Sequence, residues 1–223
     1  MFNRLFRKYQ TFRFAFTQKN EVFKKGTLLN AFYNSKTIFI HIPKTAGVSL
    51  LKSIYGDVTL SGHRSFYFNS IVLDTKSCKY FSFAFVRNPF DRLYSTYMFL
   101  KQGGMNCHDK RAFAYRLSKF KDFEDFVLNG LDKKIIFEIT HLIPQYDYIC
   151  DLMGNVLVDF VGRFENLEDD IKLLSKKLNK ELELEHYNFN NKKHYTEVYT
   201  QVMIDIVSEV YQKDIDIFGY NFK

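Results

Sequence analysis

The chain has 223 residues, of which 46% are apolar and 26% charged, and its formal net charge is +7. This length is typical of one domain, and the apolar fraction excludes an intrinsically disordered protein. The charge favours an anionic ligand, polymer or membrane surface. The three cysteines have no paired spacing, which argues against a disulfide framework and favours a reducing compartment.

The first 35 residues form a basic, aromatic segment. Its apolar side chains follow helical spacing: Phe2, Leu5, Phe6, Tyr9, Phe12 and Phe16. We expect this segment to pack on the domain, and the alternative is that residues 1–16 lie on an anionic membrane surface. The sequence has no run of about 20 apolar residues, and its first residues are too charged for a signal peptide. We therefore expect a cytoplasmic protein, with peripheral contact at the inner membrane face as the alternative.

A strand, a tight loop and a helix follow one another in residues 37–55. Residues 37–42 are β-branched and aromatic, which predicts a buried strand, and Pro43 ends it. Residues 48–55 have the apolar spacing of a helix. Such a corner points backbone N–H groups at one place and forms an anion site, to which Lys44 adds a positive charge. The alternative is an ordinary strand–helix turn with a surface lysine.

A second strand–loop–helix unit follows. Residues 79–86 read as a strand covered on both faces, and residues 89–101 as a helix that begins at Pro89. Weaker signals predict a strand at 57–60 and a helix at 66–74. Two such units predict an α/β fold with a central parallel sheet flanked by helices and a site at the carboxyl ends of its strands.

The remaining elements are assigned from turn signals and periodicity. The sequence predicts short helices in 105–135, a hairpin turn at 153–155 between strands starting at 148 and 156, a helix at 167–179 capped by Asn166, and a helix at 195–213.

The second corner carries residues that could bind a phosphate. Arg87 stands at the carboxyl end of the strand, and Ser95 lies eight residues further, about two helical turns into the next helix. An arginine fork and a hydroxyl on adjacent elements can clamp a phosphate. The alternative for Arg87 is a structural ion pair with Asp91. We expect Arg92 to pair with Asp91 or Glu165.

The motifs P-K-T-A-G-V-S (43–49) and V-R-N-P-F-D-R-L-Y-S-T-Y (86–97) together resemble the sulfotransferases that modify carbohydrate hydroxyls. The resemblance extends over about residues 37–220. It implies a P-loop-like sulfotransferase fold and one sulfotransferase domain in residues 36–223. It also implies the co-substrate 3′-phosphoadenosine-5′-phosphosulfate (PAPS), the product adenosine 3′,5′-bisphosphate, a carbohydrate acceptor and no metal.

The same resemblance assigns residues to the nucleotide. The 5′-phosphosulfate would lie on the loop and helix start formed by Pro43, Lys44, Thr45, Ala46, Gly47, Val48 and Ser49. The 3′-phosphate would lie on Arg87 and Ser95, and a basic loop with Lys192 and Lys193 would close over the nucleotide. Lys44 would also neutralise the bridging oxygen, and Ser49 would hold it aside beforehand.

Catalysis also needs a base for the acceptor hydroxyl. His63 is the first candidate, because Gly62-His63 resembles the segment that carries the base in hexuronic 2-O-sulfotransferases, although those have a further histidine where this chain has Ser61. His141 is the second candidate, and a nearby Asp or Glu the third. We expect His41 to support the core or the loop.

Two other classes of function are considered. A small-molecule kinase would also use a lysine-bearing loop, with Asp159 as a weak candidate for the metal-holding acid. A nucleic-acid-binding protein could use the aromatic and basic residues in 1–25, but no nucleic-acid motif is present. The sequence therefore favours a carbohydrate acceptor, with an acidic sugar suited to a basic rim, and no nucleic acid.

Overall fold

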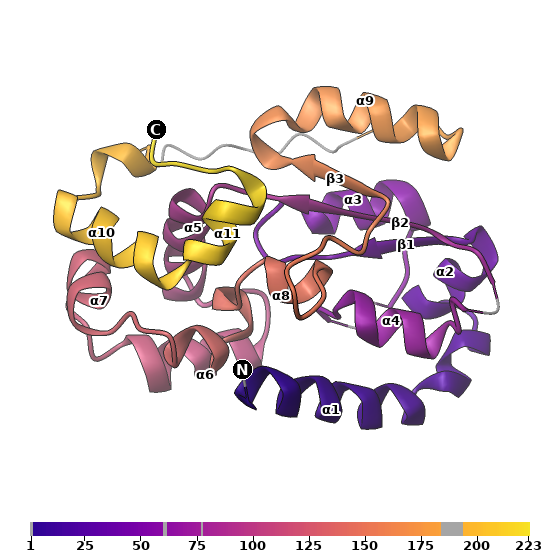
Figure 1. Cartoon of the computed structure of the whole chain (residues 1–223), viewed down its shortest axis with the longest axis horizontal. Helices are drawn as coiled ribbons and strands as arrows, with labels where there is room; N and C mark the ends of the chain where they lie inside the picture. Colours follow the sequence, from indigo (N-terminus) through magenta and orange to yellow (C-terminus); the bar gives the residue numbers. More distant parts are fainter. Residues whose placement is uncertain (1, 60–61, 77, 184–193) are drawn as a thin grey trace. The chain divides into compact units, whose positions relative to one another are not determined.

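The fold is organised around a parallel three-stranded sheet, shown in the computed structural model, which describes residues 2–59, 62–76, 78–183 and 194–223 (Figure 1). The strands are β1 (Thr37–Ile40), β2 (Phe81–Val86) and β3 (Phe160–Arg163), in the order β1-β2-β3. In register, Thr37 pairs with Phe81, and Phe83 pairs with Phe160. The prediction of an α/β fold with a parallel sheet and flanking helices is confirmed.

The chain divides into two compact units, and each is described by itself. The first unit comprises Met1–Ile42, Ala46–Val86 and Tyr146–His186. It contains the sheet and the helices α1 (Phe2–Thr17), η1 (Lys19–Phe23), α2 (Leu28–Ser35), α3 (Gly47–Tyr55), α4 (Phe66–Val72), α8 (Tyr146–Ile149), η5 (Phe164–Asn166) and α9 (Leu167–Leu178).

The second unit comprises Pro43–Thr45, Arg87–Gln145 and Tyr187–Lys223. Its described helices are α5 (Pro89–Lys101), α6 (Cys107–Ala112), η2 (Phe113–Leu117), α7 (Phe123–Asn129), η3 (Ile135–Phe137), η4 (Thr140–Leu142), η6 (Tyr195–Glu197), α10 (Gln201–Val210) and α11 (Gln212–Phe218).

The sheet forms the core of the first unit. The last five residues of β2 are buried, as expected for the middle strand of a covered sheet. The rings of Phe39 and Phe83 stack across β1 and β2 with centroids 5.1 Å apart. Aromatic and β-branched side chains pack well on the pleated, buried surface of a sheet, which explains why these residues form strands.

The second unit has its own apolar core around α5. Tyr97, on the buried face of α5, stacks on Phe126 of α7 with ring centroids 5.8 Å apart. The helix begins as the sequence predicts, since Pro89 occupies its first turn and the Asn88 side chain accepts a hydrogen bond from the Phe90 N–H. The prediction of a helix over 89–101 is confirmed.

Several boundaries differ from the predictions. β1 ends at Ile40 instead of residue 42, and at 57–60 the described backbone makes one bridge, from Thr59 to Thr27. Residues 148–149 belong to α8 (Tyr146–Ile149), where a strand starting at residue 148 was expected. The turn at 153–155 does form, because the Asp151 carboxylate accepts the N–H groups of Met153 and Asn155, but it connects one antiparallel bridge.

The C-terminal helix is divided into three. The prediction of one helix over 195–213 is wrong, since η6 is followed by α10 and α11. Thr200 caps α10 by accepting the Met203 N–H, and the chain turns at Tyr211, whose side chain is buried. The Thr200 cap and the buried side chain of Tyr211 override the continuous helical periodicity. Asn166 stands at the start of α9, as expected, but its side chain makes no capping bond.

Candidate functional site

The loop between β1 and α3 has an unusual backbone. Lys44 and Ala46 have φ angles of +69° and +64°, in the left-handed region that side chains other than glycine rarely adopt. Ala46 is the N-cap of α3, and its methyl side chain cannot cap the helix. The first backbone N–H groups of a helix point the same way and form a common binding position for an anion. Strain of this kind is often kept at functional sites.

Gly47, the first residue of α3, is pressed against His41. A Cβ built on Gly47 would lie 1.9 Å from Cδ2 and 2.2 Å from Nε2 of the His41 imidazole. No side chain fits there unless that ring moves. His41 therefore supports the start of α3, as the sequence analysis expected, and the glycine of the motif is explained by this close approach.

His63 also belongs to the first unit and contacts His41. Its Nδ1 lies 2.9 Å from the backbone oxygen of His41, and the two imidazole centroids are 4.3 Å apart. A carbonyl oxygen only accepts, so Nδ1 of His63 must donate. In neutral His63 the lone pair is therefore on Nε2, which is the nitrogen that could take a proton.

In the second unit, Arg87 joins the two motifs. Its Nη1 donates to the backbone oxygen of Lys44 at 3.0 Å and to Oγ of Ser95 at 3.3 Å, and its Nε donates to Oδ2 of Asp91 at 2.7 Å. Asp91 and Ser95 are four residues apart on α5, so both face the guanidinium. The ion pair that was considered as an alternative is thus present together with the Ser95 contact.

The backbone of Arg87 is fixed by Gln145, a residue that no sequence pattern singled out. The side chain of Gln145, which is fully buried, accepts from the Arg87 N–H and donates to the Arg87 carbonyl, both at 2.8 Å. The Gln145 N–H in turn donates to the buried carboxylate of Asp214 at 2.8 Å. This chain of bonds holds Arg87 at the end of β2. A glutamine 58 positions away gives no local sequence signal.

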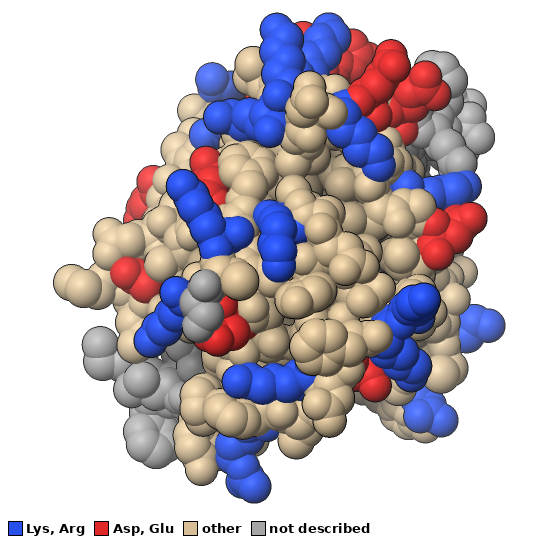
Figure 2. Space-filling view, turned by 90° about the vertical axis from the view of Figure 1, so that its right-hand side faces the viewer, with Lys and Arg blue, Asp and Glu red and all other residues tan. Residues whose placement is uncertain are grey.

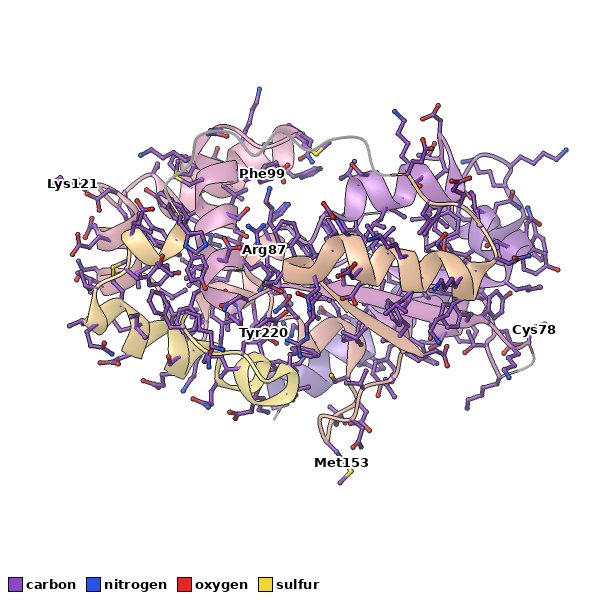
Figure 3. The ribbon with its side chains drawn as sticks, turned by 90° about the horizontal axis from the view of Figure 1, so that it is seen from above. Cys78, Arg87, Phe99, Lys121, Met153 and Tyr220 are labelled. Atoms are coloured by element: carbon purple, nitrogen blue, oxygen red, sulfur yellow. The ribbon has the colours of Figure 1, made fainter. Side chains whose placement is uncertain are left out.

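The side chain of Lys44 contacts an aromatic residue of the second unit. Its ammonium lies 4.1 Å from the ring centroid of Phe99, near the far end of α5 from Arg87 (Figure 3). This is a cation–π geometry, in which the ring face attracts the charge. The Phe99 ring also packs against the imidazole of His141, with centroids 5.2 Å apart. Phe99, which the sequence analysis missed, thus contacts both Lys44 and His141.

His141 has a carboxylate partner that the sequence did not suggest. Its Nδ1 lies 3.7 Å from Oδ1 of Asp109, and both side chains are mostly buried. Asp109 is fixed by the Met105 N–H, which donates to its other oxygen at 2.9 Å. A carboxylate next to Nδ1 favours a proton on that nitrogen and leaves Nε2 as the basic atom. His141 therefore has a carboxylate within 4 Å of Nδ1.

Arg92 holds the backbone of residues 141–143. Within the described part of the chain its guanidinium donates to the carbonyl groups of His141, Leu142 and Ile143, at 2.9 to 3.4 Å, and not to a carboxylate. The expected pairing with Asp91 or Glu165 is therefore wrong. Arg92 is 1% exposed and holds the segment that carries His141. We therefore assign Arg92 a structural role.

Asp159, the candidate metal-holding acid of a kinase, is hydrogen-bonded to Ser82. Its Oδ2 accepts from the N–H and the hydroxyl of Ser82, at 2.7 and 2.8 Å. Asp159 precedes β3, so it lies at the amino end of that strand, whereas a metal-holding acid is expected after a strand. This arrangement gives no support to the kinase interpretation.

Other expectations have the following outcomes. Lys192 and Lys193 lie outside the described residues. The described residues contain no group of three or more His, Cys, Asp or Glu that could hold a metal ion. Within the same part of the chain, no helix has both the length and the apolar character to cross a membrane.

Comparisons with known proteins agree with the two motifs. A sequence model of the group described as "Sulfotransferase family" matches residues 33–221. A protein of Archaeoglobus fulgidus described as an uncharacterized protein is 34% identical over 101 residues, which cover 44% of this chain and 68% of that protein. No solved structure matches the chain significantly.

Proposed function

Because the chain belongs to the sulfotransferase family, we propose that it transfers a sulfuryl group from PAPS to a hydroxyl of a carbohydrate. The observation that carries this proposal is the contact of Arg87 with both Lys44 and Ser95. It joins the residues proposed for the two phosphate ends of one nucleotide.

The residues of the loop fit a 5′-phosphosulfate. The turned backbone at Lys44 and Ala46 leads into an uncapped helix start, which suits an anion, and Thr45 and Ser49 add hydroxyl donors. We assign this group to residues 43–49. The Lys44 ammonium neutralises charge that develops on the bridging oxygen, which is the main electrostatic demand of the reaction.

The 3′-phosphate is assigned to Arg87 and Ser95. Asp91 fixes the guanidinium through Nε, and Gln145 fixes the backbone, so the fork is oriented before a ligand arrives. Preorientation lowers the entropy cost of binding. Arginine suits a phosphate because its planar fork can donate two parallel hydrogen bonds.

The reaction balances without a redox step. A new bond forms between the acceptor oxygen and sulfur, while the bond between sulfur and the bridging oxygen breaks and its electron pair stays on the departing adenosine 3′,5′-bisphosphate. The hydroxyl proton goes to Nε2 of a histidine. We assign the base to His63, whose Nδ1 bond to His41 supports this tautomer. His141, with the Asp109 carboxylate 3.7 Å from its Nδ1, is the second candidate.

The acceptor is proposed to be a polysaccharide or glycolipid sugar. A panel of neutral and acidic glycans, incubated with PAPS that carries labelled sulfate, tests this assignment directly. Transfer to no glycan of the panel, with transfer to a small phenol or amine, would contradict it.

The base and the donor are tested with His63→Gln and His141→Gln. The variant that lacks the base should keep its affinity for adenosine 3′,5′-bisphosphate within about twofold and lose roughly 100- to 10,000-fold in turnover. Full turnover in His63→Gln together with its loss in His141→Gln would transfer the role to His141. Calorimetric titration with the bisphosphate, compared with ATP plus magnesium, tests the nucleotide. If ATP plus magnesium bound more tightly than the bisphosphate, the proposal would be contradicted.

A further inference from the structure

The positive charge of the chain is concentrated in its first 25 residues. They contain seven Lys or Arg residues and one acidic residue, so they carry a net charge of +6. The other 198 residues contain 25 basic and 24 acidic residues and are close to neutral. In the structure this segment forms α1 and η1 of the first unit.

One side of α1 packs within the first unit. Ala15 is fully buried, the Phe14 ring stacks on Phe68 with centroids 5.8 Å apart, and Arg7 forms an ion pair of 3.0 Å with Asp147. These contacts explain why the segment is ordered as a helix. On this side the helix contacts residues of the first unit.

The other side of α1 is aromatic and exposed. Tyr9, Phe12 and Phe16 have helical spacing along one stripe, and they are 58%, 47% and 53% exposed. Phe23 of η1 is 69% exposed. Large aromatic side chains grouped on the surface of a folded unit mark an interaction site.

The same segment carries exposed basic side chains. Arg13, Lys19, Lys24 and Lys25 are exposed. Figure 2, which faces the side of the first unit where α2 lies, shows Lys and Arg side chains spread between uncharged residues, with fewer acidic ones. A helix that combines an aromatic stripe with flanking positive charge has the composition of a helix lying in the interface of an anionic bilayer.

From this arrangement we propose that α1 and η1 bind the surface of an anionic lipid bilayer, with Tyr9, Phe12, Phe16 and Phe23 inserted among the headgroups. The ring contacts favour lipid over nucleic acid. Phe12 and Phe16 pack on each other at 5.2 Å with tilted planes, and the ammonium of Lys19 lies 4.5 Å over the Phe16 ring. A nucleic-acid base needs an open ring face for stacking, whereas insertion into a bilayer needs only apolar area and nearby charge.

The chain contains no tryptophan, so a single introduced tryptophan reports on this surface. Phe16→Trp in the full chain should give blue-shifted emission when vesicles of phosphatidylglycerol and phosphatidylcholine are added, and no shift with phosphatidylcholine alone. Tyr115→Trp is the matched control, since Tyr115 is an exposed aromatic residue of the second unit. Its emission should not change. An equal shift in both variants, or in neither, would overturn the proposal.

Sedimentation with the same vesicles measures the two contributions separately. Phe12→Ser combined with Phe16→Ser should weaken binding at least about tenfold. Both side chains are exposed, so the substitutions should leave the fold intact.

Replacing Lys19, Lys24 and Lys25 by Gln should weaken vesicle binding about a hundredfold, because each basic residue contributes about 1 kcal/mol near an anionic surface. The control removes the same charge at the exposed residues Lys110, Lys119 and Lys121 of the second unit and should bind normally. Equal losses in both lysine sets would contradict a localised surface, and tighter binding to a labelled oligonucleotide than to vesicles would replace lipid by nucleic acid.

Discussion

Arg87 donates a hydrogen bond to the backbone oxygen of Lys44, and 43 positions of sequence separate the two residues. The bond connects the residue after β2 to the loop after β1. It also sets the orientation of the guanidinium, because Nη1 contacts Ser95 as well. The two motifs that the sequence singled out are thus in direct contact within the second unit.

The Arg87–Ser95 pair predicts selectivity for a 3′-phosphate. The wild type should bind adenosine 3′,5′-bisphosphate at least tenfold more tightly than adenosine 5′-monophosphate, because a hydrogen bond to a charged group contributes about 1.5–3 kcal/mol. Arg87→Lys and Ser95→Ala should each reduce this ratio, and their effects should not be additive. Calorimetry with both nucleotides measures the ratio. Arg111→Lys, at an exposed arginine, serves as control, and an unchanged ratio in Arg87→Lys would contradict the assignment.

Lys44→Ala should lower turnover by at least about a hundredfold. The substitution removes a positive charge proposed to act on the departing phosphate, a contribution that is large in sites of this kind. The measurement is the rate of labelled-sulfate transfer at saturating PAPS. Lys119→Ala is matched, since the Lys119 ammonium also lies over a phenylalanine ring, that of Phe120, at 4.9 Å. Comparable rates in Lys44→Ala and wild type would remove Lys44 from the mechanism.

Phe99 is predicted to hold Lys44 in a resting position. If the ammonium leaves the ring to contact a phosphate, Phe99→Leu removes a competing interaction of about 1 kcal/mol and should tighten the binding of adenosine 3′,5′-bisphosphate about fivefold. Phe99→Tyr retains the ring face and should bind as the wild type does. Titration calorimetry distinguishes these outcomes. Weaker binding in Phe99→Leu would show that the ring contact belongs to the bound state instead.

Gly47→Ala should destabilise the first unit by about 1–3 kcal/mol, because its Cβ overlaps the His41 ring. His41→Ala should relieve the overlap, so the double variant should be more stable than the sum of the single effects predicts. Urea unfolding of all four proteins gives the coupling free energy. A purely additive result would mean that the imidazole does not occupy this space.

Tyr211 predicts a loss of stability in alkaline solution. Burial raises the pKa of its phenol above the ordinary value of 10, and its hydroxyl donates to the Leu142 carbonyl at 2.8 Å. The folded state therefore retains the proton more strongly than the unfolded state. This contribution is fully present below the unfolded pKa, near pH 10, and is lost as the pH rises above it.

Comparison with Tyr211→Phe isolates this contribution. The variant should be less stable at pH 7, since a buried hydrogen bond is removed, and the difference from the wild type should shrink between pH 10 and pH 11. Urea unfolding at each pH gives the values. Tyr115→Phe, at an exposed position, should show the wild-type pH dependence. A difference that stays constant with pH would contradict the argument.

Local patterns predicted the elements that position the site. The apolar runs ending at Ile42 and Val86 gave the first two parallel strands, and Pro89 gave the start of α5. The predictions failed where a tertiary contact competes with local periodicity. Tyr211 turns inward to reach Leu142, so one long helix becomes α10 and α11. At residues 148–149 a helix forms, although β-propensity favoured a strand, because propensity depends on context.

The sequence by itself determined the two motifs, the family they belong to and the α/β fold, because each of these is encoded by residues close together in the chain. Only the tertiary structure decided that Phe99 contacts Lys44, that Asp109 accompanies His141, and that Gln145 fixes Arg87. These pairs are separated by 32 to 58 positions. Helical and strand periodicity reflects neighbours along the chain, whereas these contacts depend on how whole elements pack, so no local pattern records them.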